Sequence, residues 1–223
     1  MTAGDRPRDH IAQNVATYDA IADHYDQVTG TPQVRAWKEA SMRRFAGYLP
    51  GSRILVPGCG EGRDSRYLKS LALEPLSFDL SLRMLQLARS KDPDGAYVQL
   101  DLRDMGRLAA GFDGIWASGC LYHLTKAEFV DCIATCHALL GDGGILYVSL
   151  KEGEGERYEE PTLGSRYPGG DAARTRLRGV RFYAYYRRDE ILEAMAGFDL
   201  LHEQRFEPGE GSFEFWLRRK GTA

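Results

Sequence analysis

The most constraining feature of this sequence is the alternation of short apolar runs with helical patterns between residues 53 and 150. Apolar runs bounded by Gly, Pro or Asp predict buried strands, and the segments between them repeat apolar residues at helical spacing. The predicted strands are 53–56, 76–80, 96–100, 112–117 and 145–150. Strands alternating with helices are typical of a parallel sheet with helices on both faces, and right-handed crossovers make such a sheet doubly wound.

The two ends of the chain add a helical cover and two more strands. Residues 1–48 carry two helical patterns that meet at Gly30, and we expect them to form a packing layer or a lid over the sheet. The remaining expected elements are helices at 11–25, 33–48 and 188–196, and an antiparallel strand pair at 198–206 and 213–217. The prediction is a single α/β domain over residues 1–223, with a doubly wound sheet of seven mainly parallel strands.

Residues 151–180 are predicted to form a long loop. The segment is rich in Gly, Glu and Arg, which makes it too polar for a core. Long irregular loops inside a compact domain are usually functional or mobile. We expect a mobile substrate loop that covers a cleft together with residues 8–30, and a solvated charged loop is the alternative. The aromatic residues 182–186 fit either a pocket wall or a core strand.

The composition argues against several functional classes. The chain has 29 Lys and Arg and 32 Asp and Glu, which gives a net charge of −3 and no basic footprint for nucleic acid or an anionic membrane. No apolar run reaches the roughly 18 residues of a membrane span. The N-terminus lacks the apolar core of a signal peptide, so a cytoplasmic location is expected. We expect a small-molecule partner, and a homodimer stays open.

Three glycines stand between the first predicted strand and the helix that follows it: Gly58, Gly60 and Gly62. Glycine at such a junction permits a tight turn and close approach of the backbone to a ligand. The G-x-G-x-G spacing differs from the G-x-G-x-x-G of dinucleotide enzymes and from the P-loop, which disfavours a nicotinamide oxidoreductase. It favours a nucleoside ligand without a phosphate chain, and an ordinary tight turn is the alternative.

Acidic residues end the next two predicted strands. Asp79, at the end of 76–80, can accept hydrogen bonds from ribose hydroxyls, or it can simply offset the dipole of the following helix. Asp101, after 96–100, can accept from the exocyclic amine of an adenine. The carboxyl ends of parallel strands share the edge where open α/β sheets bind ligands, so these signals support one another.

This pattern resembles the class I S-adenosylmethionine-dependent methyltransferases, most clearly over residues 50–150. The resemblance implies S-adenosylmethionine as the cofactor, S-adenosylhomocysteine as the product and no metal. That family usually has an acidic residue where this chain has Val56, so another group must bind the cofactor's ammonium, and Asp64 is one candidate. The residues expected at the cofactor are Tyr18, Gly58, Cys59, Gly60, Gly62, Asp79, Leu80, Ser81, Met84, Asp101, Leu102 and Ser118.

The segment after strand 112–117 is where methyltransferases of this kind place the acceptor. His123 is the best candidate for a general base, because the pKa of a free imidazole lies near neutrality, and a structural histidine is an equal alternative. Tyr25 and Lys151 are the other predicted catalytic residues. The expected reaction is in-line methyl transfer to an O, N or S atom of a small molecule. An RNA or protein methyltransferase and a non-catalytic S-adenosylmethionine-binding protein are the alternatives.

Overall fold

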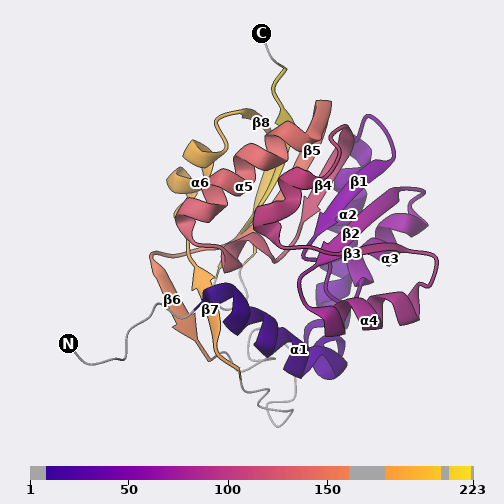
Figure 1. Cartoon of the computed structure of the whole chain (residues 1–223). Helices are drawn as coiled ribbons and strands as arrows, with labels where there is room; N and C mark the ends of the chain where they lie inside the picture. The colour runs from indigo at the N-terminus through magenta and orange to yellow at the C-terminus, as the bar shows by residue number, and fades with distance from the viewer. Residues whose placement is uncertain (1–8, 161–178, 207–210, 222–223) are drawn as a thin grey trace.

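The structure, a computed structural model, describes residues 9–160, 179–206 and 211–221. It contains a seven-stranded sheet in the order β3-β2-β1-β4-β5-β9-β8 and a separate two-stranded sheet, β6-β7 (Figure 1). The strands are β1 Arg53–Pro57, β2 Glu74–Asp79, β3 Ala96–Gln99, β4 Phe112–Ala117, β5 Leu140–Lys151, β6 Glu156–Glu159, β7 Arg181–Ala184, β8 Phe198–Phe206 and β9 Ser212–Arg219. The helices are α1 His10–Thr29, α2 Pro32–Tyr48, α3 Arg63–Ser70, α4 Leu82–Lys91, α5 Lys126–Leu139 and α6 Arg188–Ala194, with short 3-10 turns η1 Leu102–Arg107 and η2 Leu121–His123.

The sheet is doubly wound, as the sequence predicts. Strands β3, β2, β1, β4 and β5 pair in parallel, and β9 pairs antiparallel with both β5 and β8. The chain builds outward from β1 to β3, then returns to lay β4 on the other side of β1. Such a reversal of strand order opens a crevice at the carboxyl ends of the two central strands, where α/β proteins bind their ligands.

Helices cover both faces of this sheet. On one face, Phe129 and Ile133 of α5 pack in the main core cluster with Leu55 and Ile115 of the central strands. On the other face, Phe45 of α2 packs in a second cluster with Trp116 and Tyr147, whose rings stack at 3.7 Å. This arrangement confirms the predicted fold class.

The N-terminal helices form close to the predicted limits. The N–H of Gly30 caps α1, and Pro32 begins α2 directly after the N-cap Thr31, whose hydroxyl accepts from Val34 N. Helix α1 packs against α4 and β7, and so lies between the two-stranded sheet and a helix of the main sheet (Figure 1). None of the helices in the described ranges combines the length and the apolar character needed to cross a membrane.

Two regions differ from the sequence prediction. The predicted strand covers 145–150, but β5 begins at Leu140, directly after α5, and includes the glycine-rich residues 141–144. A register shift between the Phe112–Leu140 and Gly114–Ile145 pairs accommodates them, and Gly143 has a φ of 70°. In the predicted loop, residues 156–159 form the strand β6, which pairs antiparallel with the aromatic strand β7. Residues 161–178 of that loop lie outside the described residues.

Candidate functional site

A cavity of about 260 Å³ opens at the carboxyl ends of the central strands. Its lining brings together the predicted cofactor residues Tyr18, Gly58, Cys59, Gly60, Asp79, Leu80, Ser81, Met84, Asp101, Leu102 and Ser118 and the predicted catalytic residues Tyr25, His123 and Lys151. Gly62 is the exception and does not line the cavity. Gly62 instead begins α3 with a φ of 78°, and a Cβ there would lie 2.7 Å from the Tyr97 hydroxyl.

The glycine loop is a tight turn in which Gly58 packs against the protein and Gly60 faces open space. Gly58 has a φ of 59°, and a Cβ added to it would lie 2.4 Å from Cβ of Cys120. Gly60 has a φ of 55°, but apart from Gly60 and its two chain neighbours no described atom lies within 4 Å of the corresponding Cβ position. The first glycine is therefore required by packing inside the protein. The second leaves backbone accessible to a ligand.

The carboxylate of Asp79 holds this loop in place. Its Oδ2 accepts from Gly60 N at 2.8 Å, and its Oδ1 accepts from Ser81 N at 2.9 Å. Burial raises the pKa of Asp79, and the backbone N–H donors partly offset that effect. Each carboxylate oxygen has a second acceptor site, so Asp79 can still bind hydroxyl groups from a ligand.

Asp101 lies at the end of β3 and caps η1. It accepts from Arg103 N at 2.9 Å and forms an ion pair with the Arg103 guanidinium at 2.7 Å. Burial opposes the charge of Asp101, but the hydrogen bonds from Arg103 outweigh that effect and lower its pKa. Asp101 is therefore a fixed anion at the cavity wall next to Asp79.

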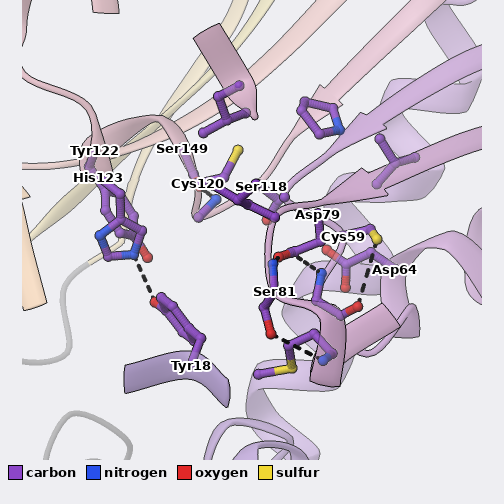
Figure 2. A pocket seen from close by; sticks show the side chains of 18 of the residues that line it. Tyr18, Cys59, Asp64, Asp79, Ser81, Ser118, Cys120, Tyr122, His123 and Ser149 are labelled. Atoms are coloured by element: carbon purple, nitrogen blue, oxygen red, sulfur yellow. Dashed lines mark hydrogen bonds between the residues drawn. The ribbon is translucent and has the colours of Figure 1, made fainter. Parts of the chain in front are cut away.

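His123 and Tyr18 face the cavity from the side opposite Asp79 (Figure 2). His123 Nδ1 lies 2.9 Å from the carbonyl oxygen of Phe182, which only accepts, so Nδ1 carries the proton. His123 Nε2 then accepts from the Tyr18 hydroxyl at 2.7 Å. Burial lowers the pKa of His123 to about 3, and the charges of Arg181 and Lys151 act in the same direction. The imidazole is thus neutral near pH 7, and its lone pair is already engaged.

Two buried cations lie beside this histidine. The Arg181 guanidinium donates to the Tyr18 hydroxyl at 3.3 Å, and its buried Nε has no hydrogen-bond partner in the part of the chain that the structure describes. The Lys151 ammonium lies 4.0 Å from the centroid of the Tyr183 ring and donates to the Tyr185 hydroxyl at 3.4 Å. This end of the cavity is therefore positively charged and aromatic.

Comparisons with known proteins agree with this architecture. The methyltransferase-domain family matches residues 54–144. Malonyl-[acyl-carrier protein] O-methyltransferase of Enterobacter lignolyticus is 30% identical over 134 residues, which are 59% of this chain and 50% of the relative. Ubiquinone biosynthesis O-methyltransferase of Xanthomonas campestris is 28% identical over 152 residues, 66% of this chain and 61% of the relative. The chain spans about half the length of the malonyl-carrier relatives that it matches.

Solved structures share the fold over nearly the whole chain. The CcbJ methyltransferase of Streptomyces caelestis superposes with a TM-score of 0.69 at 20% identity and covers 92% of this chain and 98% of its own. The 1,6-didemethyltoxoflavin-N1-methyltransferase of Burkholderia thailandensis, solved with 1,6-didemethyltoxoflavin and S-adenosylhomocysteine, gives 0.63 at 21% identity and covers 99% and 93%. Residues 54–144 therefore match the methyltransferase-domain family, and the chain as a whole shares the fold of class I S-adenosylmethionine-dependent methyltransferases. This confirms the resemblance seen in the sequence.

Val56 stands where the resemblance leads one to expect an acidic residue, and the structure shows what lies nearby instead. The Val56 side chain is buried in the core cluster that contains Trp116. Asp64, in the first turn of α3, accepts from Lys38 Nζ and from Trp116 Nε1, both at 3.0 Å. Burial opposes the charge of Asp64, but Lys38 and Arg63 outweigh it and lower the pKa to about 2. Asp64 is therefore an anion that lines the cavity.

Sequence reasoning missed Lys38 and Arg181. Lys38 lies on α2 and Arg181 on β7, which are both outside the alternating strands and helices of residues 53–150. No local sequence motif therefore predicts their place at the site. Within the described ranges, no group of three His, Cys, Asp or Glu residues is arranged to hold a metal ion. Cys132 and Cys136 are buried in the core cluster with Phe129, where they pack as small apolar side chains.

Proposed function

We propose that this protein transfers the methyl group of S-adenosylmethionine to a small-molecule acceptor by in-line displacement. The observation that carries the proposal is a cavity whose lining joins the glycine loop and Asp79 to Tyr18 and His123. Relatives named as O-methyltransferases and a solved neighbour holding S-adenosylhomocysteine with a small heterocycle support the same reaction class. The net charge of −3 supports a small acceptor over a nucleic acid. A cytoplasmic location is part of the proposal.

In this proposal the carboxylates of Asp79 and Asp101 bind different parts of the nucleoside. Asp79 accepts from the ribose hydroxyls, and Asp101 accepts from the adenine amine. Gly60 lets the backbone approach the sulfur side of the cofactor because its Cβ position is open. Charge-assisted hydrogen bonds of this kind are about twice as strong as neutral ones, so Asp79 is the main determinant of affinity.

The protein's contribution to the reaction is placement and charge. The cofactor, when bound, supplies a methyl group that its sulfonium has already activated. Fixing the acceptor in line with that methyl is worth roughly 7–11 kcal/mol of the barrier. His123 is a weak base, because its pKa is about 3 and its Nε2 already accepts from Tyr18. His123 therefore serves to orient Tyr18, and Tyr25 adds a wall next to Tyr18, their ring centroids 5.8 Å apart.

The charge of the acceptor end favours an acceptor that enters as an anion. Lys151 lines the cavity, and Arg181 lies behind Tyr18 and donates to its hydroxyl, so one buried cation faces the acceptor position and a second lies behind the cavity wall. An ionised carboxylic acid or phenol needs no base to remove a proton, which matches the neutral histidine. We therefore propose an acidic O-nucleophile as the acceptor.

Binding calorimetry with S-adenosylhomocysteine and NAD tests the cofactor assignment. We expect the wild-type protein to bind S-adenosylhomocysteine and not NAD. Asp79→Ala should lose affinity by about tenfold or more, because a hydrogen bond to a charged group contributes about 1.5–3 kcal/mol. Asp104→Ala is the matched control, since Asp104 is half-exposed and its carboxylate forms an ion pair only with Arg107, at 3.5 Å, among the described residues. Unchanged affinity in a folded Asp79→Ala variant would remove the ribose assignment.

A further inference from the structure

Lys38, Asp64 and Ser118 form a hydrogen-bonded cluster in the cavity wall, from α2, α3 and the end of β4. Lys38 Nζ donates to Asp64 Oδ2 and to Ser118 Oγ, both at 3.0 Å. All three residues line the cavity. The Lys38 and Asp64 side chains keep 19% and 11% of their surface exposed, so a ligand can reach a pair that is otherwise removed from bulk water.

The Lys38–Asp64 pair has both an unused hydrogen-bond donor and an unused hydrogen-bond acceptor. A lysine ammonium has three N–H donors, and only two are accounted for among the described residues. Asp64 Oδ2 accepts twice, from Lys38 and Trp116, whereas Oδ1 accepts no hydrogen bond from the described residues and lies 3.7 Å from Arg63 Nε. One open donor on a cation therefore lies next to one open oxygen on an anion.

The position of the Lys38–Asp64 pair in the fold indicates which part of a bound nucleoside would lie next to the pair. Asp101 follows β3, Asp79 ends β2, the glycine loop follows β1 and Ser118 follows β4, and these strands are neighbours in that order. A nucleoside with its base at Asp101 and its ribose at Asp79 directs its 5′ substituent across β1 toward β4. The Lys38–Asp64 pair lies at that end.

We propose that the Lys38–Asp64 pair binds the α-amino acid end of S-adenosylmethionine, with Lys38 Nζ donating to the carboxylate and Asp64 Oδ1 accepting from the ammonium. The assignment rests on the proposed function. A free α-amino acid group carries one positive and one negative charge, and a preformed pair of opposite charges satisfies both without leaving either buried ion unpaired. The pair thereby supplies the anion that Val56 cannot. It also makes α2 part of the cofactor site.

A purely structural role is the competing explanation, because the same ion pair ties α2 to α3. The two roles differ in their ligand dependence. 5′-Methylthioadenosine keeps the adenine, the ribose and the sulfur of S-adenosylhomocysteine but lacks its amino acid. A residue that binds the amino acid distinguishes these two ligands, whereas a residue that only supports the fold affects both equally.

The experiment is calorimetry of both ligands on the wild-type protein, Lys38→Met and Asp64→Asn. Each variant should bind S-adenosylhomocysteine about tenfold or more weakly, because each loses a charge-assisted bond to the ligand. Affinity for 5′-methylthioadenosine should change by less than about threefold, which also shows that the variant is folded. The amide introduced by Asp64→Asn keeps an oxygen that can accept from Trp116 Nε1. Lys69→Met is the control, since Lys69 lies on α3 and pairs with Asp92 at 2.8 Å outside the cavity.

The outcomes separate this inference from the proposed function. Equal losses for both ligands would assign the pair a structural role, and undiminished affinity for S-adenosylhomocysteine would remove the pair from the site. Either result overturns the inference while the cofactor assignment stands. A wild-type protein that binds neither ligand would instead overturn the proposed function, and this inference with it.

Discussion

At one end of the cavity the groups that face a ligand are carboxylate oxygens and backbone amides, and at the other end they are cations and aromatic rings. Asp79 and Asp101 define the first end. Lys151 and Tyr18 define the second, and Arg181 lies behind Tyr18 and donates to its hydroxyl. A nucleoside offers hydroxyl and amine donors, which suit the first end. The second end suits a ligand that is flat, anionic or both.

The two ends also differ in how the chain builds them. The carboxylate end comes from one stretch between Gly58 and Asp101, in which each group directly follows a strand of the parallel sheet. The cationic end comes from α1, η2, β5 and β7, which lie far apart in the sequence. The first end is therefore set by a local motif. The second depends on how several elements pack together.

The largest effect that we expect comes from breaking the cationic end at Arg181. Arg181→Met keeps the bulk of the side chain but removes its charge and its bond to Tyr18. Removing one partner of a buried charged contact costs about 2–5 kcal/mol. We expect kcat/KM with acidic acceptors to fall about a hundredfold or more, while the dissociation constant of S-adenosylhomocysteine stays within about twofold. A release assay for S-adenosylhomocysteine, run on carboxylic acids and phenols with their amides and ethers as neutral partners, measures this.

Two further variants sharpen the Arg181 test. Arg181→Lys should recover part of the activity, because it restores the charge. Arg188→Met is the control, since Arg188 on α6 is exposed and pairs with Glu203 at 2.7 Å. Turnover confined to amine acceptors, or an unchanged kcat/KM in Arg181→Met, would contradict an anionic acceptor.

A smaller effect, on stability, should distinguish Gly58 from Gly60 at the carboxylate end. Gly58→Ala combines a positive φ with a Cβ 2.4 Å from Cβ of Cys120, so we expect about 2–4 kcal/mol of lost stability. Gly60→Ala has the same kind of φ but open space, so about 1–2 kcal/mol is expected. Urea unfolding of both variants measures the difference. Equal destabilisation would mean that packing against Cys120 is not what Gly58 is needed for.

The carboxylate end was largely predictable from the sequence because its signals are local. Ser81, which directly precedes α4, caps that helix with its hydroxyl accepting from Met84 N, a role that serine commonly fills at this position. Asp79 and Asp101 lie on the cavity because strand ends share one edge of a parallel sheet. Gly62 shows the limit of this reasoning, because spacing alone does not reveal whether a glycine faces the ligand or, as here, packs against Tyr97.

The cationic end could be predicted only in part. His123 and Lys151 were found because they follow β4 and end β5, at the predicted edge. Arg181 and Lys38 were not found, because β7 and α2 reach the cavity through tertiary packing that leaves no periodic signal. The protonation of His123 was equally out of reach. The Phe182 carbonyl and the Tyr18 hydroxyl that determine it come from other segments.

The last prediction concerns the neutral state of His123 at the cationic end, and it is tested by the pH dependence of stability. The pKa of His123 is about 3 in the folded protein and 6.5 in the unfolded chain. As the pH falls below 6.5, the unfolded chain therefore binds the proton first, and the folded protein loses stability. Glu214 is buried on β9 and accepts from Ser41, Gln204 and Tyr147; burial raises its pKa in the folded protein to about 7, against 4.5 in the unfolded chain. Its contribution is present at low pH and is lost as the pH rises from 4.5.

Between pH 4.5 and 6.5 these two contributions therefore have opposite slopes, each up to about 1.4 kcal/mol per pH unit. Glu214→Gln should make the free energy of unfolding rise more steeply with pH than in the wild type, and His123→Asn should make it rise less steeply or fall. Urea unfolding of the three proteins at pH 4.5, 5.5 and 6.5 isolates the two groups, since every other titrating residue is common to all. Parallel curves for His123→Asn and the wild type would mean that His123 titrates normally. His123 could then accept a proton from the acceptor near pH 7, and the case for an anionic acceptor would rest on Arg181 and Lys151 alone.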